Sequence, residues 1–290
     1  MYGRIQKQSP NSKEQRYPYN VPYRGNFRDF NFWKSSFLIM DPKERTKRAQ
    51  LFSKAAQTYD QYAKPQRCFA KILAGVLKGH LEGKRVLEVG CGTGYFSELL
   101  LKEHPAELVL CDISDGMLEV CRKRFKNHPE VKFIKADAEC DYLGERYDFI
   151  VSNLAFQWFS SMEDGLINMR RHLKLSGDLC FSTFLKGNLR EISEFAGIGI
   201  SYPSYLEMID IVEKVFFSVH LDPGRCVCHY PNVQAMLRAL KATGVTAVSN
   251  STLHWTKDRL NIFKEEYAKQ YTDEQGVYLT WKGVFVYLHD

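Results

Sequence analysis

The segment of the sequence best suited to hold a ligand is a glycine-rich run at residues 88–94. Gly90, Gly92 and Gly94 allow the backbone to turn tightly and to approach a ligand where a Cβ would clash. The helix expected after the run offers free N–H groups to a carboxylate or a phosphate. The spacing lacks both the G-x-G-x-x-G pattern of dinucleotide folds and the Lys-Ser/Thr pair of a phosphate-binding loop. Because Glu88 precedes the first glycine, the run suits a cationic ligand and would repel a pyrophosphate.

Polar residues stand at the ends of the next three apolar runs. Asp112 comes about 20 residues after the glycine run, where a carboxylate can accept hydrogen bonds from two ribose hydroxyls. Asp137 follows the next run and could accept a hydrogen bond from the exocyclic amine of adenine, and Asn153 and Leu154 end the one after it. Each aspartate alone is equally well explained as a turn or helix-cap residue. Together, the polar strand ends predict one crevice at the carboxyl edge of a sheet.

The order of elements between residues 84 and 185 explains how these side chains would meet. Short apolar runs alternate with helical segments, and such an alternation requires crossover connections between parallel strands. The predicted strands are 84–89, 107–111, 131–134, 147–152 and 178–185, and the predicted helices are 95–103, 115–125 and 162–173. The fold class is therefore α/β, with a doubly wound, mainly parallel sheet.

Two further stretches are expected to cover this core. Apolar residues at helical spacing predict one helix over residues 44–62. The last hundred residues predict helices at 204–215, 233–242 and 257–271 and strands at 217–221, 225–230 and 277–288. A turn around Asp222-Pro223-Gly224 is expected to separate the first two of these strands. We predict a domain over residues 41–290, with its cofactor core at 84–185 and its substrate covers at 45–66 and 188–271.

Composition and charge describe a folded chain with a basic extension. The 290 residues are 44% hydrophobic and 26% charged, which is enough apolar material for a buried core. Residues 1–39 hold seven Lys and Arg against two acids, and so carry five of the six net positive charges. This basic, Tyr/Pro-containing segment, 1–40, is expected to be flexible, and Met40 is an alternative start of translation. The extension has no recognised nucleic-acid-binding motif, so no nucleic acid is expected as a partner. No apolar run of the sequence approaches the roughly 20 residues of a bilayer span, so no membrane is expected either.

The eight cysteines mostly lie within apolar runs. This placement predicts buried free thiols in a reducing cytoplasm, in place of a disulfide scaffold. Residues 226–229, Cys-Val-Cys-His, are the one metal-like grouping, but no second ligand pair has matching spacing. Their alternation fits a strand better, and no metal is expected.

Residues 84–185 resemble a class I S-adenosylmethionine-dependent methyltransferase, which implies a Rossmann-like sheet of seven strands. The resemblance makes residues 88–94, Cys91 included, the first cofactor motif and Asp112 the ribose-binding acid. It sets Asp137 beside adenine, and Asn153 and Leu154 at the methionine moiety and methyl group. The neighbouring residues that we assign to the same cofactor site are Ile113, Met117 and Ala138.

Three segments are similar to the malonyl-acyl-carrier-protein O-methyltransferases of biotin synthesis. These are the helix at 52–63 followed by Gln66, the strand-four signature at 152–159 and the Leu-Lys-x-x-Gly helix at 236–244. The resemblance covers residues 45–290, including the final strand. It departs in the basic extension and at Thr93, where relatives often carry proline. It implies methyl transfer to the free carboxylate of malonyl-acyl-carrier protein, or of malonyl-coenzyme A, and the sequence leaves the choice of carrier open.

A carboxylate is already ionised at pH 7, so its methylation needs placement and exclusion of water and no general base. We therefore expect Tyr59, Gln157 and Trp158 to act in catalysis, and Gln66 and Phe156 to contact the substrate. Tyr59 would hydrogen-bond the carboxylate or stack near the methyl group, although a packing role for each of the three is the simpler alternative.

Basic residues are expected to hold the substrate and its acidic carrier. Arg238 or Lys241, in the late cover, would pair with the malonyl carboxylate, whereas Lys186 and Arg190, after the fifth strand, would meet the carrier protein. The basic clusters at 122–126 and 170–174 end helices that start at the catalytic edge, so both are expected far from the crevice.

Three other functions are compatible with parts of the sequence. One is a carboxylate methyltransferase of the aconitate type, which shares the core and part of the Gln-Trp motif. Another is a non-catalytic S-adenosylmethionine-binding assembly factor, against which the intact loop and aromatic residues argue. The last is a nucleic-acid methyltransferase, but residues 153–156 read Asn-Leu-Ala-Phe in place of an Asn-Pro-Pro-Tyr motif.

Overall fold

The structure, a computed structural model, describes residues 42–196, 202–243 and 256–289. The basic extension predicted at 1–40 and parts of the predicted late cover, at 197–201 and 244–255, lie outside the described residues.

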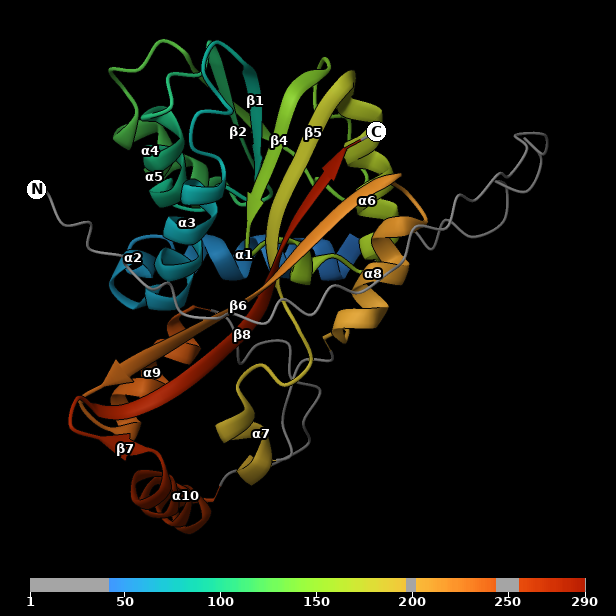
Figure 1. The fold of residues 1–290 in the computed structure, drawn as a ribbon. Helices are drawn as coiled ribbons and strands as arrows, with labels where there is room; N and C mark the ends of the chain where they lie inside the picture. The colour runs from blue at the N-terminus through green and yellow to red at the C-terminus, as the bar shows by residue number, and fades with distance from the viewer. Residues whose placement is uncertain (1–41, 197–201, 244–255, 290) are drawn as a thin grey trace, which may run out of the picture. The chain divides into compact units, whose positions relative to one another are not determined.

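A mixed sheet with a parallel half carries the elements of the site (Figure 1). Its strands are β1 (Arg85–Val89), β2 (Glu107–Asp112), β3 (Val131–Lys135), β4 (Tyr147–Asn153), β5 (Leu173–Phe184), β6 (Ser218–Tyr230), β7 (Thr272–Asp273) and β8 (Gly276–His289). Along the sheet the order is β3-β2-β1-β4-β5-β8-β6, and the short β7 pairs with β8. Strands β1 to β5 are parallel, whereas β8 runs antiparallel to both β5 and β6. The doubly wound, mainly parallel fold is confirmed, with β7 added to the seven strands that were expected.

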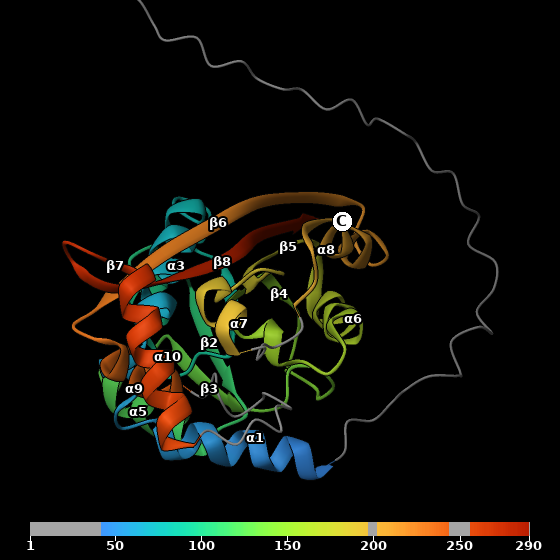
Figure 2. The same ribbon diagram turned by 90° about the horizontal axis from the view of Figure 1, so that it is seen from below.

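Helices on both faces bury the central parallel strands β1, β2 and β4, which explains their mainly apolar sequences. One face packs against α3 (Lys64–Val76), α4 (Tyr95–Leu101), α5 (Asp115–Arg124) and α9 (Val233–Ala242). The other face packs against α6 (Met162–His172) and α8 (Tyr205–Glu213). Figure 2 shows these two groups on opposite sides of the strands. Phe69 on the first face and Phe181 on the second are fully buried.

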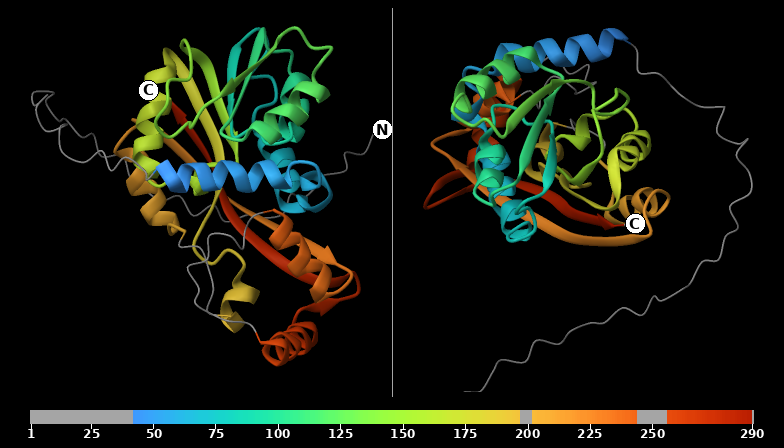
Figure 3. Two further views of the ribbon diagram at one scale, coloured as in Figure 1. Left: turned by 180° about the vertical axis from the view of Figure 1, so that it is seen from behind. Right: turned by 90° about the horizontal axis from the view of Figure 1, so that it is seen from above.

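The covering segment before the sheet consists of three helices, where one was predicted. They are α1 (Pro42–Ala55), α2 (Tyr59–Tyr62) and α3. The single predicted helix at 44–62 is interrupted because the Thr58 N–H turns back to the carbonyl oxygen of Ala55, at 3.0 Å. Helix α1 crosses the edge of the sheet at which the parallel strands end (Figures 1 and 3). Helix α3, which the sequence analysis did not anticipate, has Pro65 in its first turn, where the missing N–H has no cost.

The late part of the chain adds α7 (Arg190–Ala196), α10 (Lys257–Gln270) and the long strand β6. The prediction of two strands joined by a turn at Asp222-Pro223-Gly224 is wrong, because β6 runs through all three residues and pairs continuously with β8. Proline is tolerated there because β6 is the last strand in the sheet order. The predicted strand at Cys226, Cys228 and His229 is confirmed as part of β6.

Two cysteines depart from the prediction of free thiols. Cys68 of α3 and Cys226 of β6 form a disulfide across 158 residues of sequence, a pairing that only the packing of α3 on the sheet brings about. The other six cysteines are free, and all but Cys140 are buried. Among the described residues, no helix is long and apolar enough to cross a membrane, and no cluster of side chains forms a metal site.

Candidate active site

A pocket of about 990 Å³, its open mouth included, lies at the carboxyl ends of β1, β2 and β4. Helices α1, α2 and α3 supply the facing wall. The predicted site residues that line the pocket are Tyr59, Gln66, Glu88, Gly90, Cys91, Gly92, Asp112, Ile113, Met117, Asp137, Ala138, Asn153, Leu154 and Trp158.

The glycine loop lies between β1 and α4 and is fastened to β2. The N–H groups of Gly90 and Cys91 both donate to the carbonyl oxygen of Cys111, at 2.8 and 3.0 Å. Gly90 has φ +69°, and a Cβ on it would lie 2.4 Å from the Cβ of Ala155. Any other residue there would push the loop away from the end of β4. Gly94, at the start of α4, packs against the ring of Phe125, so its role in the described structure is to let α5 approach the loop.

Asp112 ends β2 and is 8% exposed. Its two carboxylate oxygens accept hydrogen bonds from the N–H groups of Gly92 and Ser114, at 2.9 and 2.8 Å. Burial raises the pKa of Asp112 to about 6, and the backbone N–H groups offset part of that rise. The carboxylate is therefore mostly ionised at neutral pH and keeps further acceptor capacity toward the pocket.

Glu88 is 1% exposed and accepts a hydrogen bond from the hydroxyl of Ser97, at 2.5 Å. Burial raises the pKa of Glu88 to about 8, the Ser97 hydroxyl lowers it in part, and the charge of Asp112 raises it further. A cation in the pocket would favour the ionised form of this carboxyl group. The two buried carboxyls thus make the loop side of the pocket receptive to positive charge.

Tyr59 begins α2 and lies in the wall opposite the loop. Burial of its phenol and the charges of Asp112 and Asp60 hold the pKa of Tyr59 above its ordinary value, and Gln66 offsets this only in part. The hydroxyl therefore stays protonated across the physiological range. It is a hydrogen-bond donor in the pocket and has no tendency to serve as a base.

Asn153 ends β4, Leu154 follows it, and both line the pocket. The side-chain N–H of Asn153 donates to the carbonyl oxygen of Gln66 at 3.0 Å, and its carbonyl oxygen accepts from the Ser182 hydroxyl at 2.9 Å. Asn153 therefore ties α3 to the ends of β4 and β5. Leu154 has φ +54°, a left-handed conformation that residues other than glycine rarely adopt, and such strain is concentrated at functional sites.

Asp137 stands after β3, with Ala138 and Ile113 also in the pocket wall. One of its carboxylate oxygens accepts a hydrogen bond from the N–H of Glu139, at 3.1 Å. Met117 of α5 is buried beside them and gives this end of the pocket an apolar surface. The combination suits a flat, partly polar ligand group.

Some residues of the segment after β4 line the pocket, and others pack behind its wall. Trp158 of the 3₁₀ helix η2 (Phe156–Trp158) lines the pocket, edge-to-face with Phe52 of α1 at 5.3 Å between ring centroids. Gln157 donates from its side chain to the carbonyl oxygen of Leu154, at 2.6 Å, and accepts from Thr183. Phe156 is buried and stacked on Phe181. In the described structure, Gln157 and Phe156 hold the aromatic wall and do not belong to the pocket lining.

The basic residues in the pocket differ from those predicted. Lys186, Arg190, Arg238 and Lys241 are exposed, and none is among the described residues that line the pocket. Arg48 of α1 and Arg67 of α3 do line it. Sequence analysis missed both because α3 was not predicted and because nothing in the local pattern shows which side of α1 faces the strand ends.

A network around Asp60 ties α2 to the glycine loop and α5. The Asp60 carboxylate accepts from the Thr93 hydroxyl on one oxygen and from Nη2 of Arg124 on the other, the latter at 2.6 Å. The carbonyl oxygen of Asp60 accepts from Arg67. The prediction that the cluster at 122–126 lies far from the crevice is therefore wrong for Arg124. The end of α5 lies beside the loop, where the thiol of Cys121 donates to the carbonyl oxygen of Gly92 at 3.1 Å.

Comparison with solved structures supports the fold. A candidate methyltransferase from Bacillus halodurans gives a TM-score of 0.56 at 15% identity, over 76% of this chain and 97% of that one. The YcgJ protein of Bacillus subtilis gives 0.55 at 14% identity, over the same share of each chain. At such low identity these likenesses establish the fold alone.

Sequence comparison identifies the family. The profile described as "Methyltransferase domain" matches residues 86–177. Malonyl-[acyl-carrier protein] O-methyltransferases of Bacteroides thetaiotaomicron and Haemophilus ducreyi are each 32% identical, over 82% of this chain and 95% and 94% of theirs. The Bacteroides fragilis protein of that name is also 32% identical, but the chain spans only about half, 49%, of its length. The chain therefore belongs to the malonyl-[acyl-carrier protein] O-methyltransferase family, whose cofactor is S-adenosylmethionine.

Proposed function

We propose that this protein transfers the methyl group of S-adenosylmethionine to the free carboxylate of malonyl-[acyl-carrier protein], giving the methyl ester that primes pimeloyl synthesis for biotin. The observation that carries this proposal is that a neutral tyrosine and two arginines face a buried acidic loop across one pocket. Names of the relatives support malonyl-acyl-carrier protein as the acceptor. Six free thiols are consistent with work in a reducing compartment, and we propose the cytoplasm.

The loop side of the pocket fits the cofactor. Asp112 would accept from the ribose hydroxyls, Asp137 from the adenine amine, and Ile113, Met117 and Ala138 would contact the adenine ring. Glu88 and the ends of β1 and β4 would hold the methionine portion. When bound, the cofactor supplies an activated methyl group on a positively charged sulfur, and the ionised forms of Glu88 and Asp112 balance that charge.

The cover side fits a carboxylate acceptor. Tyr59 keeps its proton and would donate it in a hydrogen bond to one carboxylate oxygen. Arg48 or Arg67 would neutralise the charge, and we propose them in place of Arg238 and Lys241 because they line the pocket. Phe52 and Trp158 would keep water from the acceptor. Because the acceptor is already ionised, these residues need only orient it and remove no proton.

The direct test is methyl transfer from labelled S-adenosylmethionine to malonyl-acyl-carrier protein, malonyl-coenzyme A, free malonate and aconitate. We expect kcat/KM to be highest for the carrier-bound substrate, since only that substrate offers a docking surface. Higher kcat/KM with aconitate would instead make the protein an aconitate-type enzyme.

The same assay tests which surface of this protein binds the acyl-carrier protein. We propose that Lys186 and Arg190 meet the acidic carrier, so reversing both to Glu should slow turnover of carrier-bound malonate more than of malonyl-coenzyme A, most clearly at low salt. Reversing Lys123 and Lys126, which leaves Arg124 intact, is the matched control. A larger effect of reversing the control pair would indicate that the carrier protein binds at the end of α5.

Asp112→Ala should weaken the binding of S-adenosylhomocysteine about a hundredfold, because it removes charge-assisted hydrogen bonds worth roughly 2–3 kcal/mol. Isothermal titration calorimetry measures the affinity. Asp112→Asn keeps the size of the side chain and one acceptor oxygen. Its affinity for S-adenosylhomocysteine should fall between those of the unmodified protein and Asp112→Ala. An unchanged affinity in a folded Ala variant would remove Asp112 from the cofactor site.

Affinity for S-adenosylmethionine should rise by up to about 25-fold between pH 6.5 and 8.5, as Glu88 loses its proton through a pKa of about 8. Below that pKa Glu88 is protonated and the bound sulfonium must displace the proton, so binding near pH 7 should release protons. Calorimetry in two buffers of different ionisation enthalpy counts them.

S-adenosylhomocysteine is the control ligand, since it shares the titrating amino group and lacks the sulfonium charge. Its affinity should rise less with pH, and Glu88→Gln should make the two pH profiles alike. Equal slopes for both ligands in the unmodified protein would contradict the role given to Glu88.

Arg124→Met should weaken S-adenosylhomocysteine binding about fivefold, the loss expected when a partly exposed ion pair worth about 1 kcal/mol is removed. Without Arg124, Asp60 holds α2 against the loop less firmly. Lys123→Met, one residue earlier and exposed, should leave the affinity unchanged. Equal effects of the two substitutions in calorimetry would show that Arg124 acts only through net charge.

A further inference from the structure

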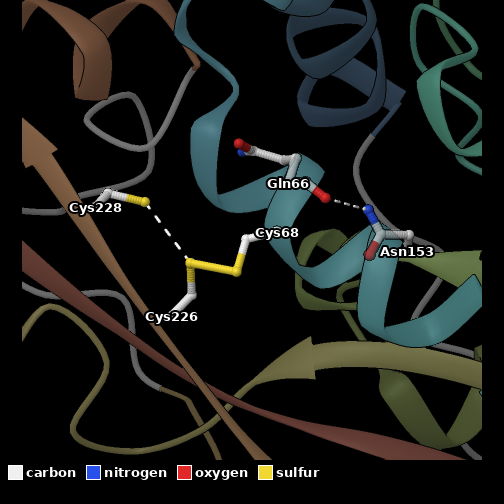
Figure 4. Close-up of a disulfide and its surroundings, with 5 residues drawn as sticks. All are labelled: Gln66, Cys68, Asn153, Cys226 and Cys228. Atoms are coloured by element: carbon white, nitrogen blue, oxygen red, sulfur yellow. Dashed lines mark hydrogen bonds between the residues drawn. A yellow bond between two sulfur atoms is a disulfide. The ribbon is translucent and has the colours of Figure 1, made fainter. Parts of the chain in front are cut away.

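The disulfide between Cys68 and Cys226 joins the pocket's cover to its sheet (Figure 4). Cys68 lies in the second turn of α3, and Cys226 lies in β6, with 6.6 Å between their Cα atoms. That separation is within the range that a disulfide spans without moving the backbone. The bond is therefore compatible with the packing of α3 on β6 as it stands.

The bond is close to residues that line the pocket. Gln66 and Arg67 directly precede Cys68, and both belong to the pocket wall. Figure 4 shows the Gln66 carbonyl oxygen turned toward Asn153, whose side-chain N–H donates to it. Lys64 makes another tie between α3 and β6, donating to the carbonyl oxygen of His229 at 2.6 Å. The start of α3 is thus tied to β4 and β6 by these two hydrogen bonds and by the disulfide.

The two cysteines of the bond differ in their exposure to solvent. Cys68 is half-buried, whereas Cys226 is 7% exposed. We therefore expect a thiol from solvent to react at Cys68, since access is one of the factors that set the rate of exchange.

Cys228 lies on the same face of β6, with its sulfur 3.8 Å from that of Cys226. Burial raises the pKa of the Cys228 thiol to about 11, although Lys64 and Arg67 nearby lower it in part. Since the thiolate is the attacking species, Cys228 reacts slowly at neutral pH. Cys228 is therefore a thiol next to the disulfide that we expect to take no part in exchange with a reductant.

We propose that Cys68–Cys226 is a reversible redox site at which a dithiol reductant loosens the cover and lowers the affinity of the pocket for its cofactor. A thiolate of the reductant attacks the Cys68 sulfur and forms a mixed disulfide, and Cys226 leaves as a thiolate that takes up a proton. The second thiol of the reductant then closes its own disulfide and releases Cys68. Two electrons and two protons pass to the protein, which ends with two thiols, while the reductant ends as a disulfide.

The coupling to the pocket must act in both directions. If the intact bond holds Gln66 and Arg67 in their binding positions, a bound ligand must favour the intact bond by the same factor. A disulfide that stabilised only the fold, without touching the binding equilibrium, would show no such reciprocity. The inference concerns the cofactor pocket and does not depend on which acceptor is methylated.

The test equilibrates the full chain in ratios of reduced to oxidised dithiothreitol, with and without saturating S-adenosylhomocysteine. Acid quenching, alkylation and mass spectrometry then give the fraction of Cys68 and Cys226 that is bonded. We expect the ligand to raise the ratio at half-reduction about fivefold, within the range of couplings between sites. Calorimetry should show the same factor between the affinities of the oxidised and reduced protein.

Two variants separate the bond from the other thiols. Cys68→Ser cannot form the bond, so its affinity for S-adenosylhomocysteine should equal that of the reduced protein under every condition. Cys228→Ser should respond to the reductant as the unmodified chain does. The inference is overturned if the ratio at half-reduction is the same with and without ligand, or if Cys68 and Cys226 are alkylated under fully oxidising conditions. A redox response that persists in Cys68→Ser, or disappears in Cys228→Ser, would also overturn it.

Discussion

The buried carboxylate of Asp112 is the contact on which the rest of the pocket depends. One oxygen holds the glycine loop through Gly92, and the other holds the start of α5 through Ser114. Ser114 in turn caps α5 and shares a hydrogen bond with Ser53 of α1, at 2.8 Å. A single side chain therefore sets the positions of the loop, of one flanking helix and, one step further, of the covering helix. Burial of this charge is tolerable because backbone donors replace its water.

The parallel core was predictable because its signals are local. Strands β2 and β4 are short apolar runs that end in a polar residue, Asp112 and Asn153, and the apolar β1 runs into the glycine loop. Burial on both faces explains these runs without reference to distant segments. The residues at those strand ends do line one pocket. Trp158, which the resemblance of residues 152–159 to the family's strand-four signature indicated, also lines the pocket.

The cover could not be predicted in the same way, because its contacts join segments far apart in sequence. Arg124 and Asp60 are 64 residues apart, and their ion pair follows from how closely α5 passes the loop. The lack of a Cβ at Gly94 permits that approach, yet its sequence context indicates only a turn. Gln157 has the type of a catalytic residue, but both ends of its amide are engaged by neighbours after folding. Cys68 and Cys226 gave no pairing signal, since they are 158 residues apart and neither local pattern points to the other.

Strand β6 has a consequence for the behaviour of the protein at high concentration. It is 13 residues long and, in the part of the chain that the structure describes, pairs along one side only, with β8. A long strand at the border of a sheet offers its free backbone groups to the same strand of another molecule, which begins aggregation. Pro223 lies near the middle of β6 and has no N–H to donate, and it is preceded by the exposed, polar His220 and Asp222. Pro223, for which the sequence analysis predicted a turn, thus interrupts the row of backbone donors along β6. It thereby hinders pairing of β6 with the same strand of another molecule.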